Sequence, residues 1–313
     1  TAKAEMACLE ALAVSPNNVD VLAVLYRVKR KAGRANEAID VLRRIIKANP
    51  NLLWALNEIS AQLFQRGDRI ECETHARYAI RVAPRNPQAH NMMGLIMSET
   101  NRALAGEYHF HRALEYGGEN ARVAANLANN LKYQGKMDES ERYYELALKI
   151  EPGHVPTIVN YARMEEARRN FPKAWDLLKR AESIAPEGVD LSLTKAVLHG
   201  REKNYDQAIA DLTTAANEGR KGQGLSSVHL FERGRLYDKM DRFDEAWADF
   251  TEANRVVREV QGRKYGEKAA TALVRNCKNF FTRQRLQLLP RAGSLEDVAQ
   301  PLFGREQAAL LVD

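Results

Sequence analysis

A triplet of small, larger and small apolar residues recurs along the chain at a fixed interval. In each interval a small residue, a larger residue and a second small residue stand at i, i+4 and i+7, which places all three on one face of a helix. The larger residues of these triplets follow one another at steps of 34 positions: Cys8, Leu42, Ala76, Phe110, Tyr144 and Leu178. Small residues let neighbouring helices approach closely, so the pattern predicts repeated, packed helices.

A second apolar stripe precedes the triplets and predicts a second helix in every interval. Its residues are Leu22 and Leu25, Leu56 and Ile59, His90 and Met93, Ala124 and Leu127, and Ile158 and Tyr161. A glycine or a polar residue separates the two helices, at Gly33, Gly67, Asn101, Gly135 and Asn170. A proline or glycine closes each interval, at Pro16, Pro50, Pro84, Gly118, Pro152 and Pro186. Neither helix can bury its apolar face alone, so the units are expected to stack around one continuous core.

This 34-residue helix–turn–helix pattern resembles the tetratricopeptide-repeat (TPR) family. The resemblance implies an all-α fold, a right-handed superhelical solenoid of helix pairs with a C-terminal capping helix. We expect residues 1–18 to be the second helix of an incomplete repeat and residues 19–260 to form seven repeats. The sixth repeat is four residues longer than the others because of a Gly-rich basic segment near 217–224. We interpret this insertion as a longer turn, and a basic loop that touches a partner is the alternative.

The period ends after the seventh repeat. Residues 261–288 are expected to form the capping helix, because they carry an apolar stripe of helical spacing. The residues of this stripe are Leu273, Val274, Cys277, Phe280 and Phe281. Residues 289–313 are expected to be a linker or tail.

The seventh repeat carries a narrower resemblance. Its segments from Phe231 to Asp238 and from Phe243 to Ala246 are similar to the last repeat of bacterial TPR-linked sulfotransferases. In that family a helix and a linker lead to an apolar strand and a loop that binds the 5′-phosphosulfate of the sulfonate donor. The run Pro301-Leu302-Phe303 is similar to the start of that strand, but the loop does not follow it. The resemblance therefore implies a substrate-recruiting region whose catalytic domain is not in this chain.

Charge and composition indicate which kinds of partner and which cellular location are expected. Lys and Arg number 47 against 41 Asp and Glu, and the two signs are interleaved along the chain. A nucleic-acid track needs one dominant sign, so we expect no nucleic-acid partner. No apolar run reaches the roughly 18 residues of a membrane span, and no signal peptide is visible, which favours a cytoplasmic location. The three cysteines form no CxxC pair, which indicates buried, reduced thiols.

Sequence motifs give no catalytic, metal or cofactor site. No GxxxxGK[ST], GxGxxG, GxSxG or HExxH motif occurs. His109 and His111 are a poor metal pair, because residues at i and i+2 point to different faces of a helix. Whether the parent protein is an enzyme stays open, since only the sulfotransferase resemblance bears on it.

The TPR resemblance also implies which residues line a binding groove, because in that family the first helix of each unit faces the concave surface. The groove candidates are Asn57, Asn91, Asn126, Asn129, Lys132, Asn160, Arg163 and Arg235. Asn126 and Asn160 stand one period apart and resemble the asparagine ladder in the repeats of O-linked N-acetylglucosamine transferase, which grips a peptide backbone. An amide side chain offers both a donor and an acceptor, so it can pair with any extended peptide. Alternatively, these asparagines cap or solvate the helix surface.

Two functions are therefore consistent with the sequence. The first is a TPR interaction module that binds a protein or an extended peptide in its concave groove. The second is the substrate-recruiting region of a TPR-linked sulfotransferase, with an adjacent catalytic domain as a further partner.

Overall fold

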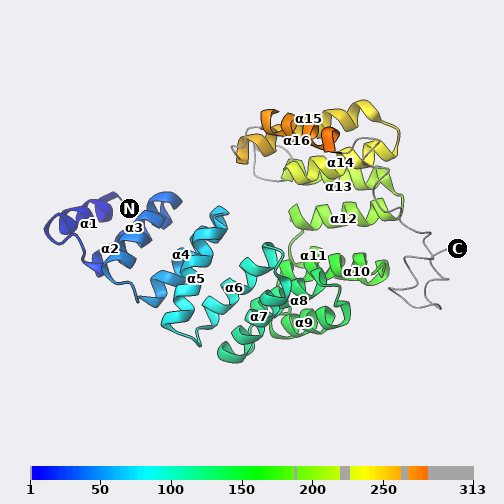
Figure 1. The fold of residues 1–313 in the computed structure, drawn as a ribbon. Coiled ribbons are helices and arrows are strands. Elements are labelled where there is room, and N and C mark those ends of the chain that lie inside the picture. The colour runs from blue at the N-terminus through cyan, green and yellow to red at the C-terminus, as the bar shows by residue number, and fades with distance from the viewer. Residues whose placement is uncertain (1, 187–188, 219–225, 262–266, 281–313) are drawn as a thin grey trace. The chain divides into compact units, whose positions relative to one another are not determined.

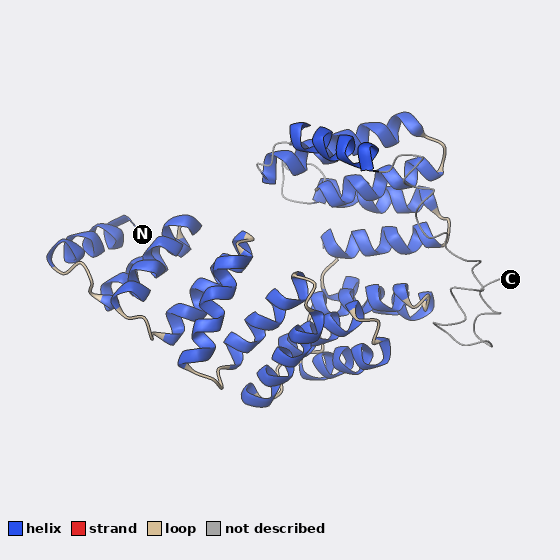
Figure 2. Ribbon diagram, in the orientation of Figure 1, coloured by secondary structure: helices blue, strands red, loops and turns tan. Residues whose placement is uncertain are grey.

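The structure is a computed structural model that describes residues 2–186, 189–218, 226–261 and 267–280. All regular secondary structure in these residues is α-helical (Figure 2), so the all-α prediction is confirmed. The helices, labelled in Figure 1, are α1 (Ala2–Val14), α2 (Val19–Lys31), α3 (Ala35–Ala48), α4 (Leu53–Arg66), α5 (Arg69–Val82), α6 (Pro87–Glu99), α7 (Ala103–Gly117), α8 (Ala121–Tyr133), α9 (Met137–Ile150), α10 (Val155–Ala167), α11 (Phe171–Ile184), α12 (Val189–Arg201), α13 (Tyr205–Glu218), α14 (Ser227–Lys239), α15 (Phe243–Gln261) and α16 (Glu267–Phe280).

The chain divides into two compact units. The first, Thr1–Ala253, contains α1 to α14 and the first part of α15. The second, Asn254–Asp313, contains the end of α15 and, among its described residues, α16. α16 falls within the expected capping segment, but its capping role stays a prediction. The tail 289–313, most of the Gly-rich segment near 217–224, and the side chains of Leu273, Cys277, Phe280 and Phe281 lie outside the described residues.

Asparagine side chains begin several of the first helices in the repeats. Asn18 accepts from the backbone N–H groups of Asp20 and Val21 at 3.1 Å, and Asn120 accepts from Val123 N at 3.1 Å. These bonds satisfy donors that the first turn of a helix leaves unpaired. Where an asparagine stands two residues after the closing proline or glycine, its cap therefore marks the start of the next repeat, whereas α4 and α10 begin without such a bond.

A single left-handed residue makes the turn inside each helix pair. Positive φ occurs at Gly33, Gly67, Asn101, Gly135, Arg169, Lys203 and Asp241, all at the same position of the repeat. The sequence analysis placed the turn of the fifth repeat at Asn170, which is wrong by one residue. Asn170 instead precedes α11 and donates its Nδ2 to Glu165 Oε2 at 2.9 Å. A non-glycine residue pays a steric cost at this position, which is why arginine gave no recognisable signal.

Both apolar stripes are buried, which confirms the helical pattern. No residue of the first-helix stripe or of the larger second-helix series is more than 6% exposed. Phe110 and Tyr144, the largest members of the series, are fully buried. Full burial of one such side chain contributes roughly 1.5–3 kcal/mol, so the stacked stripes are the main source of stability in the first unit.

The first helices of the repeats lie side by side and form one layer of the first unit. α4 contacts α6, α6 contacts α8, and the series continues through α10 and α12 to α14. No pair of second helices makes comparable contact within the described residues. Helices on the inside of a curved stack are closer together than those outside, so the first helices carry the inner face.

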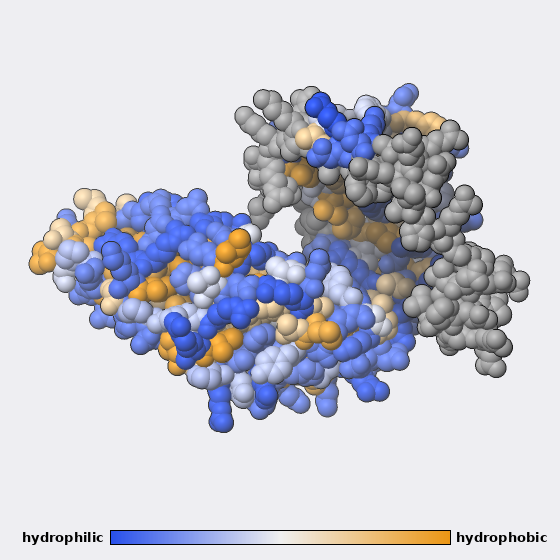
Figure 3. Space-filling model, viewed as in Figure 1, coloured by the Kyte–Doolittle hydropathy of each residue, from blue (hydrophilic) through white to orange (hydrophobic). Residues whose placement is uncertain are grey.

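Interleaved charges join neighbouring repeats. Arg43 on α3 pairs with Glu71 on α5 at 2.7 Å, and Lys136 pairs with Glu107 on α7 at 2.8 Å. On the face that Figure 3 shows, apolar residues form separate patches among hydrophilic ones. Across the described residues, no helix is both long enough and apolar enough to span a membrane.

Candidate peptide-binding groove

Two amides of the inner face are bonded to each other across a repeat boundary. Asn126 on α8 donates its Nδ2 to Asn91 Oδ1 on α6 at 3.1 Å. Both side chains are half-buried. The bond uses one donor and one acceptor, and each amide group has further capacity. Asn91 and Asn126 therefore form a connected polar surface on neighbouring inner helices.

Two other predicted groove residues are held by side chains of their own or the next repeat. Asn57 on α4 donates to Asn86 Oδ1 at 3.4 Å, while its buried Oδ1 has no hydrogen-bond partner in the described structure. Tyr144 on α9 donates its hydroxyl to Asn129 Oδ1 on α8 at 2.7 Å. Asn129 thus presents its Nδ2 as the remaining donor.

Asn160 on α10 stands one period after Asn126 and is half-buried. In the described part of the chain its side chain makes no hydrogen bond, and it differs in this from Asn91, Asn126 and Asn129. Its amide therefore offers both a donor and an acceptor to a ligand on the inner face.

Further along the inner face, α8, α10, α12 and α14 line a cavity of about 640 Å³, which we call the inner cavity. Its apolar lining includes Leu193, Val197 and Val228. Its polar lining comprises Lys132, Arg163, Glu166, Asp190, Thr194 and Glu232. Four consecutive repeats contribute to it, so it forms only when they stack.

Most charges around the inner cavity are compensated inside the protein. Arg163 donates to Thr194 Oγ1 at 2.9 Å and to Asp190 Oδ1 at 3.1 Å. Glu166 pairs with Arg201 at 2.6 Å. The carboxylates that line the cavity on α10 and α12 are therefore already partnered.

Arg235 on α14 is exposed and does not line the inner cavity. It pairs with Glu232, one helical turn away, at 3.0 Å. Exposed pairs of this kind contribute little stability, and the pair leaves Glu232 compensated by a neighbouring charge.

Lys132 is the cation of the inner cavity that has no carboxylate within ion-pair distance among the described residues. Burial lowers its pKa, the charge of Arg163 adds to that effect, and Glu166 opposes it. A half-buried ammonium group gains from any anion that reaches it. Lys132 is thus the charge of the inner cavity that is left for a ligand.

Of the residues that line the inner cavity, the groove candidates of the sequence analysis include only Lys132 and Arg163; Thr194, Val197 and Val228 are among those it missed. Thr194 and Val197 stand one period after Asn160 and Arg163, so the 34-residue register was the signal that could have found them. Val228 is displaced from that register by the longer sixth repeat.

The histidines beside Phe110 point to different neighbours. His109 Nδ1 lies 3.0 Å from His90 Nδ1, whereas the ring of His111 meets Tyr143 edge-on with centroids 5.8 Å apart. In the residues that the structure describes, no three His, Cys, Asp or Glu side chains are grouped to hold a metal ion.

Comparison with known proteins identifies the repeat. The model of the tetratricopeptide repeat family matches residues 121–154, which contain α8 and α9. The chain has the tetratricopeptide-repeat fold. A TPR protein from Parabacteroides merdae superposes with a TM-score of 0.64 at 15% identity, over 82% of this chain and 97% of that one. The Cut9–Hcn1 hetero-tetramer of the APC/C gives a TM-score of 0.59 at 15% identity, over 84% of this chain and 50% of that one.

One curated relative is similar in sequence to this chain. Anaphase-promoting complex subunit 3 from Schizosaccharomyces pombe is 23% identical over 211 residues, 67% of this chain and 31% of that protein. The chain therefore spans about a third of the length of that relative. These relatives do not support the narrower resemblance to sulfotransferases, which stays a prediction. Its Pro301–Phe303 segment lies outside the described residues.

Proposed function

We propose that this TPR solenoid is a protein-interaction module that holds an extended polypeptide along its inner face. The inner cavity carries the proposal: it combines an apolar floor with the unpaired charge of Lys132. Asn160 stands one helical turn before Arg163 of the same cavity, so an amide adjoins it. Concave sites with an apolar lining and a few placed polar groups are typical of ligand binding.

The spacing of the repeats suits an extended peptide. Packed helices lie roughly 8–10 Å apart, and an extended chain rises about 3.3 Å per residue. Amides one repeat apart, such as Asn126 and Asn160, would therefore meet backbone groups about three residues apart. Because the contact is to backbone, this part of the binding is independent of the ligand's sequence.

Two of the similar proteins belong to multi-subunit assemblies. One is subunit 3 of the anaphase-promoting complex, and the other is part of the APC/C hetero-tetramer Cut9–Hcn1. They share the fold with this chain at low identity. They support an interaction role without indicating which polypeptide this chain binds.

The test is to measure binding of the full chain to an array of immobilised 12-residue peptides of varied sequence. Asn160→Ala should weaken binding to all selected peptides by a similar factor, because it removes contacts to the peptide backbone. Lys132→Ala should weaken binding to acidic peptides selectively. The matched control is Asn36→Ala, an exposed asparagine on the second helix α3.

If Asn160→Ala and Asn36→Ala bind the array equally, the Asn160 side chain only solvates the helix surface and does not contact the peptide. If Lys132→Ala loses no preference for acidic peptides, the inner cavity is not the binding site.

A further inference from the structure

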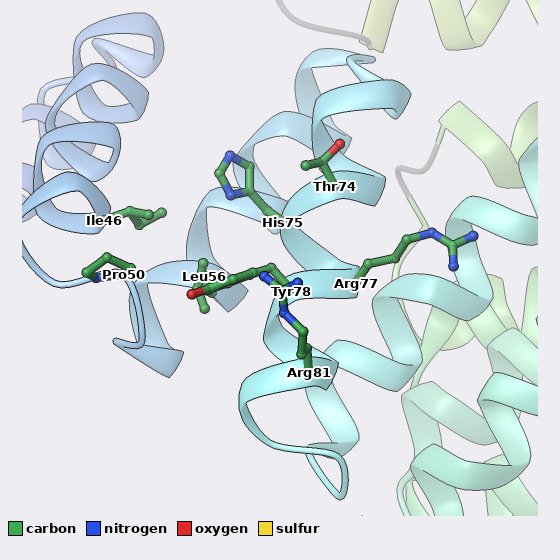
Figure 4. A pocket seen from close by; sticks show the side chains of 8 residues that line it. All are labelled: Ile46, Pro50, Leu56, Thr74, His75, Arg77, Tyr78 and Arg81. Atoms are coloured by element: carbon green, nitrogen blue, oxygen red, sulfur yellow. The ribbon is translucent and has the colours of Figure 1, made fainter.

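A second cavity lies at the junction of the first two repeats, away from the inner helix faces. It has a volume of about 670 Å³ and is lined by residues of α3 and α5, the turn at Pro50, and Leu56 of α4. We call it the outer cavity. Figure 4 shows Tyr78 extended between Pro50 and the helix α5, with Arg81 beside it.

Two equivalent junctions are crossed by an arginine, whereas this one is not. Arg44 on α3 donates to the carbonyl oxygen of Pro16 at 3.1 Å, and Arg180 on α11 donates likewise to the carbonyl oxygen of Pro152. Tyr78 stands at the position of these arginines in the second repeat. Its hydroxyl donates instead to Asn51 Oδ1 at 2.9 Å. No arginine therefore crosses to Pro50 from this position.

The outer cavity has an apolar floor. Leu56 is fully buried beneath it, and Ile46 is partly buried at its side. The ring of Tyr78 forms a wall, while Thr74 is exposed at the rim. An apolar side chain placed here would remove this surface from water, at about 25 cal/mol for each Å² buried.

The charged groups at the outer cavity are all basic. Arg77 and Arg81 line it, and no carboxylate does. Arg77 is paired with Glu73 at 2.6 Å. Arg81 instead lies over the ring of Tyr78, 4.5 Å from its centroid, and has no carboxylate within ion-pair distance among the described residues. Arg81 is thus a positioned cation beside an apolar floor.

We propose that the outer cavity binds a segment of a partner protein in which an apolar side chain is followed closely by a carboxylate. The apolar side chain lies against Ile46 and the ring of Tyr78, above the buried Leu56, and the carboxylate pairs with Arg81. A guanidinium–carboxylate pair beside a partly desolvated ring is among the stronger polar contacts available to a surface site. No carboxylate lines the outer cavity, so nothing in its lining opposes an acidic segment beside Arg81.

The test uses fluorescent 12-residue peptides and the full chain. One peptide carries Leu-Phe-Asp-Glu at its centre, a second Leu-Phe-Lys-Lys and a third Ser-Ser-Asp-Glu. We expect the first to bind at least about tenfold more tightly than the others. Arg81→Glu should weaken it at least about tenfold by charge reversal, and Thr74→Trp should weaken it by filling the cavity without changing the charge.

Lys149→Glu is the matched control, because this exposed residue on α9 stands at the position of Arg81 in another repeat and makes the same change of charge. It should bind the first peptide as the wild type does. Equal loss in Lys149→Glu would overturn the proposal, because binding would then follow net charge alone. Loss in Lys132→Ala instead of Arg81→Glu would assign the peptide to the inner cavity. Competition by octanoate at the affinity of the peptide would show a site for small anions, and it too would overturn the proposal.

Discussion

The ring of Phe110 on α7 lies directly against Gly94 on α6. A Cβ atom built on Gly94 would come within 2.6 Å of the ring, far inside van der Waals contact. The seventh repeat has the same pair, Gly234 and Phe250, with the same 2.6 Å approach. In these two repeats the helices pack closely because a phenylalanine of the second helix faces a residue with no side chain.

We predict that Gly94→Ala lowers the stability of the protein by about 1–3 kcal/mol. The added methyl group overpacks a fully buried contact, although alanine gains about 1 kcal/mol of helix propensity over glycine. The double variant Gly94→Ala with Phe110→Leu should recover part of the loss, because the smaller side chain makes room. Urea midpoints of the wild type, both single variants and the double variant measure this coupling, and purely additive effects would contradict it.

We predict that Arg169→Gly raises the stability by about 0.5–1 kcal/mol. Arg169 has φ of 61°, and a left-handed conformation costs a non-glycine residue roughly 1–2 kcal/mol. Glycine removes that cost but gains entropy in the unfolded chain, which offsets part of it. Its matched control is Gly135→Ala at the same position of the preceding repeat, where φ is 76° and no atom lies within 4 Å of the added methyl group. This change should destabilise the protein, and opposite signs in urea unfolding are the expected outcome.

The sequence predicted the fold well because the same pattern of apolar and small residues recurs in every repeat. Each position of the pattern recurs at one period, so a single exception does not obscure it; Ile45, for example, stands where the other repeats have alanine. The residue that makes the fifth turn was missed because arginine, unlike glycine or asparagine, is not a residue type that indicates a left-handed backbone.

The site was harder to predict than the fold. The register identified the inner helices and Asn160, but the bond from Asn126 to Asn91 joins different positions of neighbouring repeats. Which amide side chains are hydrogen-bonded within the protein therefore depends on the rotation of each helix in the stack. The outer cavity depends on the path of Tyr78, which a periodic pattern of apolar residues does not specify.

We predict that Cys72 reacts slowly with thiol reagents in the native protein. Its side chain is fully buried, and its thiol donates to the carbonyl oxygen of Ser60 at 3.1 Å. Burial raises the pKa of Cys72 to about 12, so almost no thiolate is present at neutral pH. Labelling followed by peptide mass spectrometry should show modification of Cys72 only as the protein unfolds in urea. Rapid labelling without denaturant would mean that the first and second helices of this repeat open readily.

The pair His90 and His109 couples stability to pH. His90 Nε2 lies 3.0 Å from the carbonyl oxygen of Pro84, which can only accept, so this nitrogen carries the proton. His90 Nδ1 is then an acceptor, and His109 Nδ1 donates to it at 3.0 Å. Burial lowers the pKa of His109 to about 4, and the charges of His90 and Arg77 add to this effect.

We predict that the protein loses about 1–2 kcal/mol of stability through His109 between pH 7.5 and pH 5, after a discount for its partial exposure. Below the ordinary histidine pKa of 6.5 the unfolded chain binds a proton at this site that the folded chain does not. The free energy of unfolding therefore decreases as the pH is lowered, until the folded pKa of about 4 is reached. The carboxyls of Glu73 and Glu141, whose pKa values are held at about 2 by ion pairs, titrate below this window. His109→Gln keeps a donor for His90 but does not titrate, so its urea midpoint should fall less between the two pH values. His111→Gln, which changes an exposed histidine on the same helix, should behave as the wild type does, and an equal pH dependence in all three proteins would show that the imidazole pair does not couple folding to protons.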